Sequence, residues 1–156
     1  MTNGEPDLLK GLATEEIEGA LALGVGLTIA SGTELFHLGD TADRIFILQR
    51  GRIRLTLPIH VRGRVEEIFV EESTAGQTVG WSALMPPYRF TLTATALVDT
   101  HVIALSREAL REYFARYPGV GYVVSLNLAA VIGQRLQLFQ AMWLREMQRT
   151  IELRCA

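Results

Sequence analysis

The sequence predicts an α+β fold: an antiparallel eight-stranded β jelly-roll barrel with short N-terminal helices and a long C-terminal helix. Between residues 25 and 105, short segments rich in β-branched and aromatic residues recur at roughly ten-residue spacing, divided by glycine, aspartate and serine-glycine turns. Helical periodicity is confined to the residues before and after this region. The two patterns together place helices at both ends of one barrel.

Composition indicates a single domain, residues 1–156. Of the 156 residues, 49% are apolar and 21% charged, and the net charge of −2 gives no basic footprint for nucleic acid. The single cysteine, Cys155, excludes an internal disulfide, and the acidic N-terminus lacks an apolar signal core. No uncharged apolar run approaches the ~18 residues of a membrane span. We therefore expect a cytoplasmic protein with no membrane segment.

The N-terminal helices are expected within residues 8–24, where leucine and isoleucine recur at helical spacing. Thr14, followed by Glu15 and Glu16, is typical of an N-cap with acidic residues in the first turn. Gly24 is typical of the residue after a helix.

The barrel is expected over residues 25–105. In residues 52–57, Ile53 and Leu55 alternate with polar neighbours, which indicates a half-buried strand. Gly63 marks the tip of the hairpin that follows, between two arginines. The other strands are expected at residues 25–29, 34–37, 44–49, 65–72, 89–98 and 100–105.

Two helices are predicted over residues 106–153. Ser106 has the side chain of an N-cap and precedes a helix that reaches about Tyr117. Pro118 fits the first turn of a final helix that runs to about Leu153, because proline is tolerated where the N–H has no helical partner.

The final helix carries an apolar seam in which Ile132, Leu136, Phe139 and Trp143 recur at three- and four-residue steps. Such steps are typical of a helix pair. One small barrel does not cover so long a stripe, so we expect a homodimer through these residues. The alternative is that this face packs only on the protein's own barrel.

Residues 76–96 predict an anion pocket. Gly80 ends a strand and precedes one short helical turn, which Pro86 and Pro87 stop, and Arg89 follows on the next strand. A helix N-terminus presents unpaired N–H groups, and an arginine returning beside it would complete a site for a negative charge.

The chain resembles the cyclic-nucleotide-binding domain family, the sensor module of catabolite-activator-type regulators, over about residues 8–149. The run from Gly80 to Leu84 with Arg89 shortly after falls where the family keeps its phosphate-binding cassette. The other residues that carry the resemblance are Gly32, Leu35, Phe36, Gly39, Asp40, Ala42, Asp43, Ile45, Phe46, Ile47, Leu48, Gly51, Ile53, Leu55, Val102, Ile103, Ala104, Leu105, Ser106 and Leu110.

In this family a cassette Gly-Glu pair contacts the ribose, and the arginine of an Arg-Ser/Thr-Ala run pairs with the cyclic phosphate. The resemblance therefore implies a ligand site at Gly80, Trp81, Ser82, Ala83, Arg89 and Thr91. The hydroxyls of Ser82 and Thr91 and the backbone N–H groups of Ser82 and Ala83 would lie near the anion. Trp81 replaces the glutamate, and an indole N–H donates but cannot accept, so Trp81 is expected to stack on a base or close the pocket.

Two further positions depart from the family pattern. Arg89 lies about one position early against the following strand, and one position reverses the facing of a side chain. Either a bulge or shorter loop turns it towards the ligand, or it is a solvated surface arginine. Gln140 stands close to where the family's last helix reaches the purine, with Phe139 placed to stack on the base. A core phenylalanine and a solvated glutamine are the alternative.

The resemblance implies a non-enzymatic regulatory sensor that binds a cyclic nucleotide, cAMP or cGMP, or another small phosphate or anion, and needs no other cofactor. It would signal through its C-terminal dimer helix to an unknown effector protein. The alternative is a ligand-free interaction or dimerisation scaffold whose pocket is filled by Trp81 and other side chains of the protein.

Other chemistry is not expected. His37, His60 and His101 are scattered, so a metal centre is not predicted, and no hydrolase or P-loop motif occurs. Transcription regulators of the resembled family carry a helix-turn-helix domain after the long helix. This chain ends at Ala156, so we expect no direct DNA binding, unless the sequence is a fragment.

Overall fold

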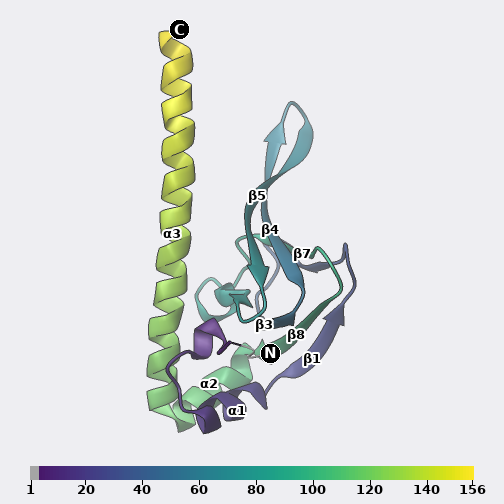
Figure 1. Ribbon diagram of the computed structural model, residues 1–156, viewed down its shortest axis with the longest axis vertical. Coiled ribbons are helices and arrows are strands. Elements are labelled where there is room, and N and C mark those ends of the chain that lie inside the picture. The colour runs from purple at the N-terminus through teal and green to yellow at the C-terminus, as the bar shows by residue number, and fades with distance from the viewer. Residues whose placement is uncertain (1–3) are drawn as a thin grey trace.

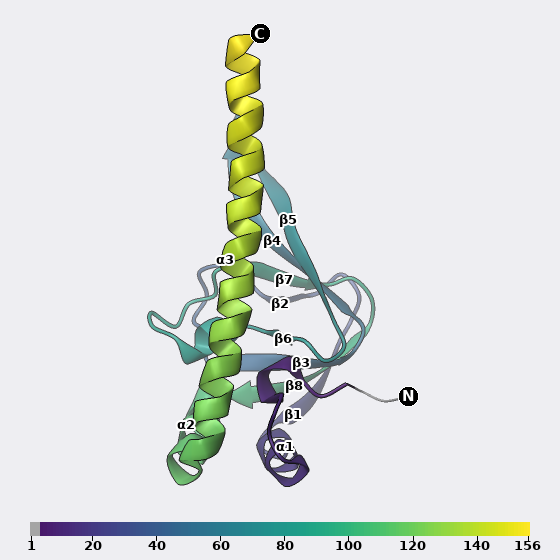
Figure 2. The same ribbon diagram turned by 60° about the vertical axis from the view of Figure 1, so that its left-hand side comes forward.

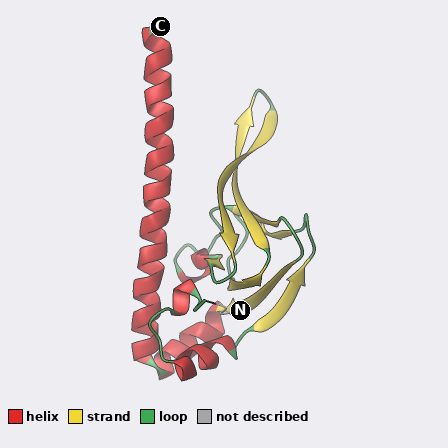
Figure 3. Cartoon of the chain, viewed as in Figure 1, coloured by secondary structure: helices red, strands yellow, loops and turns green. Residues whose placement is uncertain are grey.

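The computed structural model describes residues 4–156. A short 3-10 helix, η1 (Asp7–Leu9), and α1 (Thr14–Leu21) precede the strands, and α2 (Arg107–Arg116) and α3 (Pro118–Cys155) follow them. Figure 1 shows the barrel on one side of α3, and Figure 3 shows the strands gathered in one body with the long helix beside them. The predicted fold class is confirmed.

The strands form two antiparallel four-stranded sheets, with orders β1-β8-β3-β6 and β2-β7-β4-β5. Sequence neighbours are therefore often in different sheets, which is the arrangement of a jelly roll. The strands are β1 (Val25–Ile29), β2 (Glu34–Phe36), β3 (Arg44–Arg50), β4 (Arg52–Val61), β5 (Arg64–Thr74), β6 (Thr78–Val79), β7 (Thr93–Ala96) and β8 (Thr100–Ser106).

The core is continuous from the barrel to the helices. Ile45, Phe46, Ile47 and Leu48 of β3 are all buried, although successive side chains of a strand point to opposite faces. Both faces of this strand are therefore covered. The four side chains belong to one apolar cluster that also includes Leu8 of η1.

The N-terminal turn is fastened to α3 and to the barrel. The side-chain amide of Asn127 donates to the carbonyls of Leu8 at 2.9 Å and Lys10 at 2.8 Å. The Asp7 carboxylate accepts from the hydroxyl of Thr78 at 2.6 Å. These bonds hold the lower part of α3 against the barrel that contains the site.

The helix starts confirm two predictions and correct one. The hydroxyl oxygen of Ser106 accepts from the N–H of Ala109 at 3.1 Å, and Pro118 is in the first turn of α3, as predicted. Thr14 is the first residue of α1 and not its N-cap, which is Ala13. The N–H of Ala13 donates instead to the Glu16 carboxylate at 2.9 Å, so a glutamate caps this end.

The strands around the hairpin and the cassette differ from the predicted lengths. β4 and β5 run on past Pro58 as a two-stranded ribbon, visible above the barrel in Figure 1, because β7 pairs only with residues 53–56 of β4. Arg62 and Gly63 turn the ribbon, both with positive φ. β7 begins at Thr93, and Arg89 forms only an isolated bridge with Thr41.

Helix α3 is the longest element. Its 38 residues extend roughly 57 Å at 1.5 Å per residue. Figure 2 shows that α3 and the β4–β5 ribbon extend from the barrel in the same direction, and that the C-terminal turns of α3 reach beyond the ribbon. None of the helices in residues 4–156 has an apolar stretch long enough to cross a bilayer.

Candidate functional site

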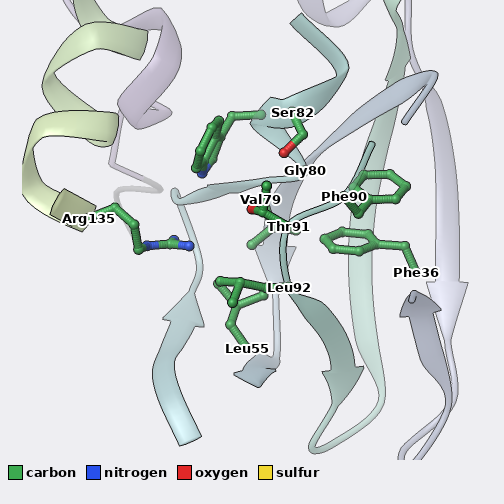
Figure 4. A pocket seen from close by; sticks show the side chains of 10 residues that line it. Phe36, Leu55, Val79, Gly80, Ser82, Phe90, Thr91, Leu92 and Arg135 are labelled. Atoms are coloured by element: carbon green, nitrogen blue, oxygen red, sulfur yellow. The ribbon is translucent and has the colours of Figure 1, made fainter. Parts of the chain in front are cut away.

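A small cavity lies beside the predicted cassette, between the two sheets and α3. Its volume is about 10 Å³, roughly the space of one water molecule. Figure 4 shows the side chains around it. The lining residues are Phe36, Leu55, Val79, Gly80, Trp81, Ser82, Phe90, Thr91, Leu92 and Arg135. Four of the predicted site residues, Gly80, Trp81, Ser82 and Thr91, are thus brought together here.

Gly80 is required by its backbone and by its neighbours. Its φ is +80°, in the left-handed region that side chains other than glycine rarely adopt. A Cβ atom at this position would lie 3.1 Å from the Phe90 ring and 3.2 Å from the Arg44 carbonyl oxygen. The strand therefore approaches its neighbours closely here, and the chain turns at once into the cassette helix.

The cassette helix, η2 (Trp81–Leu84), is a single 3-10 turn. The N–H of Ala83 donates to the Gly80 carbonyl at 3.0 Å, so it is not free to bind an anion. Ala83 is also fully buried and does not line the cavity. The predicted role of the Ala83 N–H is corrected on these grounds, whereas Ser82 keeps its place in the lining.

The side of the cavity where a phosphate was expected is apolar. Phe36 and Phe90 stack face to face with ring centroids 3.8 Å apart, and Figure 4 shows the two rings together. Arg89 lies about one position early against the following strand, so Phe90 stands at the position where the resemblance implies an arginine. Phe90 is buried, and its ring lines the cavity.

Arg89 lies outside the cavity. It is exposed, and its Nη1 donates to the carbonyl of Gly39 at 2.9 Å. The physical reason is the bridge to Thr41, which gives residues 89 and 90 the alternate facing of a strand. With Phe90 pointing inwards, Arg89 must point outwards, so the prediction of an inward-facing Arg89 is corrected to the solvated alternative.

Arg135 of α3 is the one charged side chain among the ten lining residues. It is 9% exposed, and its Nη2 forms an ion pair with Glu71 of β5 at 2.6 Å. Figure 4 shows its guanidinium reaching from the helix towards Thr91 and Leu92. The cation at this site therefore comes from the long helix and not from the barrel.

A second, larger space adjoins the cavity. A groove of about 330 Å³ lies between α3 and the cassette, and it shares Trp81, Thr91, Leu92 and Arg135 with the cavity. Ile132, Leu136 and Phe139 form its helical side. Phe139 thus takes part in the site region, whereas Gln140 is exposed and lines neither space.

Sequence reasoning missed Arg135 and Phe90, although the sequence holds a signal for each. Between Arg116 and Arg145, Arg135 is the only charged residue in a largely apolar helix, which marks a charge with a special environment. For Phe90, the one-position offset already implied that the inward-facing residue follows Arg89.

No group of three or more histidine, cysteine, aspartate or glutamate side chains within residues 4–156 is arranged to hold a metal ion.

The comparison with protein families agrees with the fold. The family model described as "Cyclic nucleotide-binding domain" matches residues 27–117, more than half of the chain. The chain belongs to this family.

Individual relatives extend the match into α3. The chain is 29% identical over 134 residues to the cyclic AMP receptor protein of Thermus thermophilus, covering 86% of this chain and 58% of that protein. It is 31% identical over 136 residues to glutaminase 1 of Bradyrhizobium diazoefficiens, covering 85% of this chain and 20% of that protein. The chain therefore spans less than two thirds of either relative.

A solved structure shows the same fold. The crystal structure of the Thermus thermophilus catabolite activator protein superimposes with a TM-score of 0.73 at 27% identity, covering 91% of this chain and 63% of that chain.

Proposed function

We propose that the chain is a cytoplasmic, non-enzymatic sensor that binds a small anion, either cAMP, cGMP or another small phosphate, between the cassette and α3. The proposal rests mainly on Arg135. Its guanidinium is almost buried and lines both the cavity and the groove. Gly80, Trp81, Ser82 and Thr91 would form the barrel side of the same site.

The ion pair with Glu71 is compatible with an exchange of partners. A nearly buried cation is costly without a negative partner, and Glu71 supplies one at 2.6 Å. The Glu71 carboxylate is itself about one third exposed, so it can turn into solvent. An anionic ligand would replace Glu71 as the partner of Arg135 and leave the guanidinium paired.

The ligand must open the site. A cavity of about 10 Å³ does not hold a nucleotide, whereas the adjoining groove of about 330 Å³ is of the size of ligand pockets. The two spaces are divided by residues that line both, including Trp81 and Leu92. If α3 moved away from these side chains, the cavity and the groove would become one space. Ligand binding would therefore favour a different position of α3.

Signalling through α3 is supported by its exposed apolar positions. Leu126, Leu136, Trp143 and Met147 are exposed, and they follow the alternating three- and four-residue steps of a helix pair, with Ala129, Gly133 and Gln140 at the intervening steps. Of the predicted dimer residues, Leu136 and Trp143 are thus free to contact a second copy. Ile132 and Phe139 are half-buried towards the protein's own groove.

A ligand screen tests the proposal directly. The protein is heated with cAMP, cGMP, other nucleotides and simple phosphates, and a ligand of the native state raises the melting temperature in a concentration-dependent way. Sedimentation of the protein with and without the best ligand then measures its effect on dimerisation. By linkage, a ligand that acts through α3 changes the dimer dissociation constant, and an unchanged constant rejects the signalling role.

The second candidate function is a ligand-free dimerisation scaffold. The observation that favours it is the filled barrel side of the cavity, where Phe36 and Phe90 stack and Leu55 and Leu92 add further apolar lining. A scaffold forms the α3 dimer in the absence of any ligand and shows no melting shift with the screened anions. The same two experiments therefore separate the two functions.

A further inference from the structure

A cleft on the other side of the cassette has no role in the function proposed above. Its volume is about 260 Å³, and it lies where the segment after η2 meets α2 and α3. Leu84 and Tyr88 come from the cassette side, Phe114 from α2 and Leu128 from α3. None of these residues lines the cavity that contains Arg135.

Two arginines one helical turn apart, Arg107 and Arg111 of α2, line this cleft. Within residues 4–156, neither guanidinium has a carboxylate oxygen within 4.0 Å. No aspartate or glutamate lines the cleft either. The cleft therefore carries two positive charges that the protein does not neutralise locally.

Arg107 is fixed in place without using its whole guanidinium. Its Nη1 donates to the carbonyl of Ala42 at 2.9 Å, and more distantly to that of Ala83. Its guanidinium carbon lies 4.1 Å from the centroid of the Tyr88 ring. Within the described residues, no hydrogen bond engages its Nη2 or Nε, so a half-buried, held guanidinium retains free donors.

The remaining walls are mainly apolar, and the one further polar side chain in the lining, Ser125, donates its hydroxyl to the Gly121 carbonyl at 2.7 Å. Leu84, Phe114 and Leu128 are half-buried and belong to the partly buried shell of the apolar core. Val124, at the base of the cleft, is almost fully buried. A ligand that fits must therefore combine a negative group with a compact hydrophobic body.

We propose that this cleft binds a small organic anion. Its carboxylate or phosphate oxygens would accept hydrogen bonds from Arg107 and Arg111, since guanidinium forks match both groups. Its aromatic or branched aliphatic body would lie against Phe114 and Leu128. Because the cleft and the Arg135 site share the cassette segment and α3, a ligand here would also alter affinity at the first site.

Phenyl phosphate and benzoate are suitable probes, with phenol and inorganic phosphate as their separate halves. Each is titrated into the full chain, and backbone amide signals are followed by NMR. We expect saturable shifts at Tyr88, Arg111 and Leu128 for the two aromatic anions. Phenol and inorganic phosphate should each bind at least about tenfold more weakly, since each lacks one half of the recognition. The two aromatic anions together distinguish a phosphate from a carboxylate preference.

Arg111→Gln is the test variant, and Arg116→Gln is its matched control on the same helix. Both arginines are exposed, so neither substitution should change the melting temperature, and Arg116 does not line the cleft. Loss of one charge-assisted hydrogen bond should weaken the aromatic anions about tenfold to a hundredfold in Arg111→Gln and less than about twofold in Arg116→Gln. Arg107 is left intact because it holds the Ala42 carbonyl.

The proposal is overturned by no saturable binding of either aromatic anion, by equal effects of the two arginine variants, or by binding of phenol or inorganic phosphate alone that matches the aromatic anions. Shifts confined to Trp81 and Arg135 also overturn it, because they place the probe at the other site. These outcomes leave the proposal for Arg135 untouched, since Arg111 does not line its cavity.

Discussion

The two sides of the cavity are built differently. The barrel side is held by a stacked pair of buried phenylalanines, Phe36 and Phe90, behind a glycine turn that no other residue fits well. The helix side offers one guanidinium, Arg135, whose partner Glu71 is partly exposed. The barrel side is therefore closed and uncharged, and the helix side is charged and able to change partners.

This difference shows where a signal would begin. In the family pattern described above, an arginine of the barrel holds the phosphate. The helix would then respond to the ligand only through the barrel. Here the barrel position is Phe90, and the cation stands on α3 itself. An anion that binds to Arg135 would touch the signalling element directly.

The largest expected effect is on the barrel side. Phe90→Ala removes one ring of the stack and leaves a cavity that the sheets cannot close, so it should lower the free energy of unfolding by about 3–5 kcal/mol. Phe69→Ala is the control, because Phe69 is 53% exposed on β5 and should cost less than about 1 kcal/mol. Urea unfolding measures both, and similar losses would mean that Phe90 is not a core residue.

A charge on the exposed seam of α3 should have the next largest effect. Leu136→Asp should weaken dimerisation by about 2–4 kcal/mol, since it places a carboxylate at the centre of a helix interface. Gln137→Asp introduces the same charge at the next position, away from the seam, and should change the dimer little. Sedimentation velocity measures both dissociation constants. If the wild type is a monomer at micromolar concentration, the proposed α3 dimer is wrong.

Gly80→Ala should destabilise the protein by about 1–3 kcal/mol, because it combines a positive φ with contacts of 3.1–3.3 Å to its neighbours. Gly26→Ala is the control, since its φ is not in the left-handed region and a Cβ there meets nothing within 4 Å. Thermal unfolding compares the two. Equal shifts would show that the turn at Gly80 is not constrained.

The smallest expected effect is a difference in coupling energy between two ion pairs whose glutamates, Glu71 and Glu72, are neighbours on β5. A double-mutant cycle on Arg135 and Glu71 should give a coupling energy of about 1–2 kcal/mol. The same cycle on Arg52 and Glu72 should give less than about 0.5 kcal/mol, because the Arg52 side chain is 52% exposed, against 10% for Arg135, and the charged atoms are 3.4 Å apart. If the two pairs had the same coupling energy in 0.5 M salt, the burial of Arg135 would not strengthen its ion pair.

The fold was predictable because its signals are local. Alternation along residues 52–57, the cap at Ser106 and the proline at 118 each determine structure within a few residues, and the structure confirms them. The Thr14 cap failed because Glu16 offers a competing acceptor for the same helix end.

The site was predictable only in part because it depends on side-chain facing and on distant elements. Gly80, Trp81, Ser82 and Thr91 follow from local chain order and line the cavity. Arg89 and Phe90 depend on which side of a bridge each residue takes, and a shift of one residue exchanges them. Arg135 meets Glu71 across 64 positions of sequence, which no local pattern encodes.

The most direct test of the central claim, that the cation of this site belongs to α3, is calorimetric titration of cAMP into the wild type, Arg135→Gln and Arg89→Gln. We expect Arg135→Gln to weaken binding about tenfold or more, since it removes a charge-assisted hydrogen bond, and Arg89→Gln to change it less than about twofold. Loss of affinity in Arg89→Gln with full affinity in Arg135→Gln would contradict the claim. If the wild type does not bind cAMP, the proposal that cAMP is a ligand of this site is wrong.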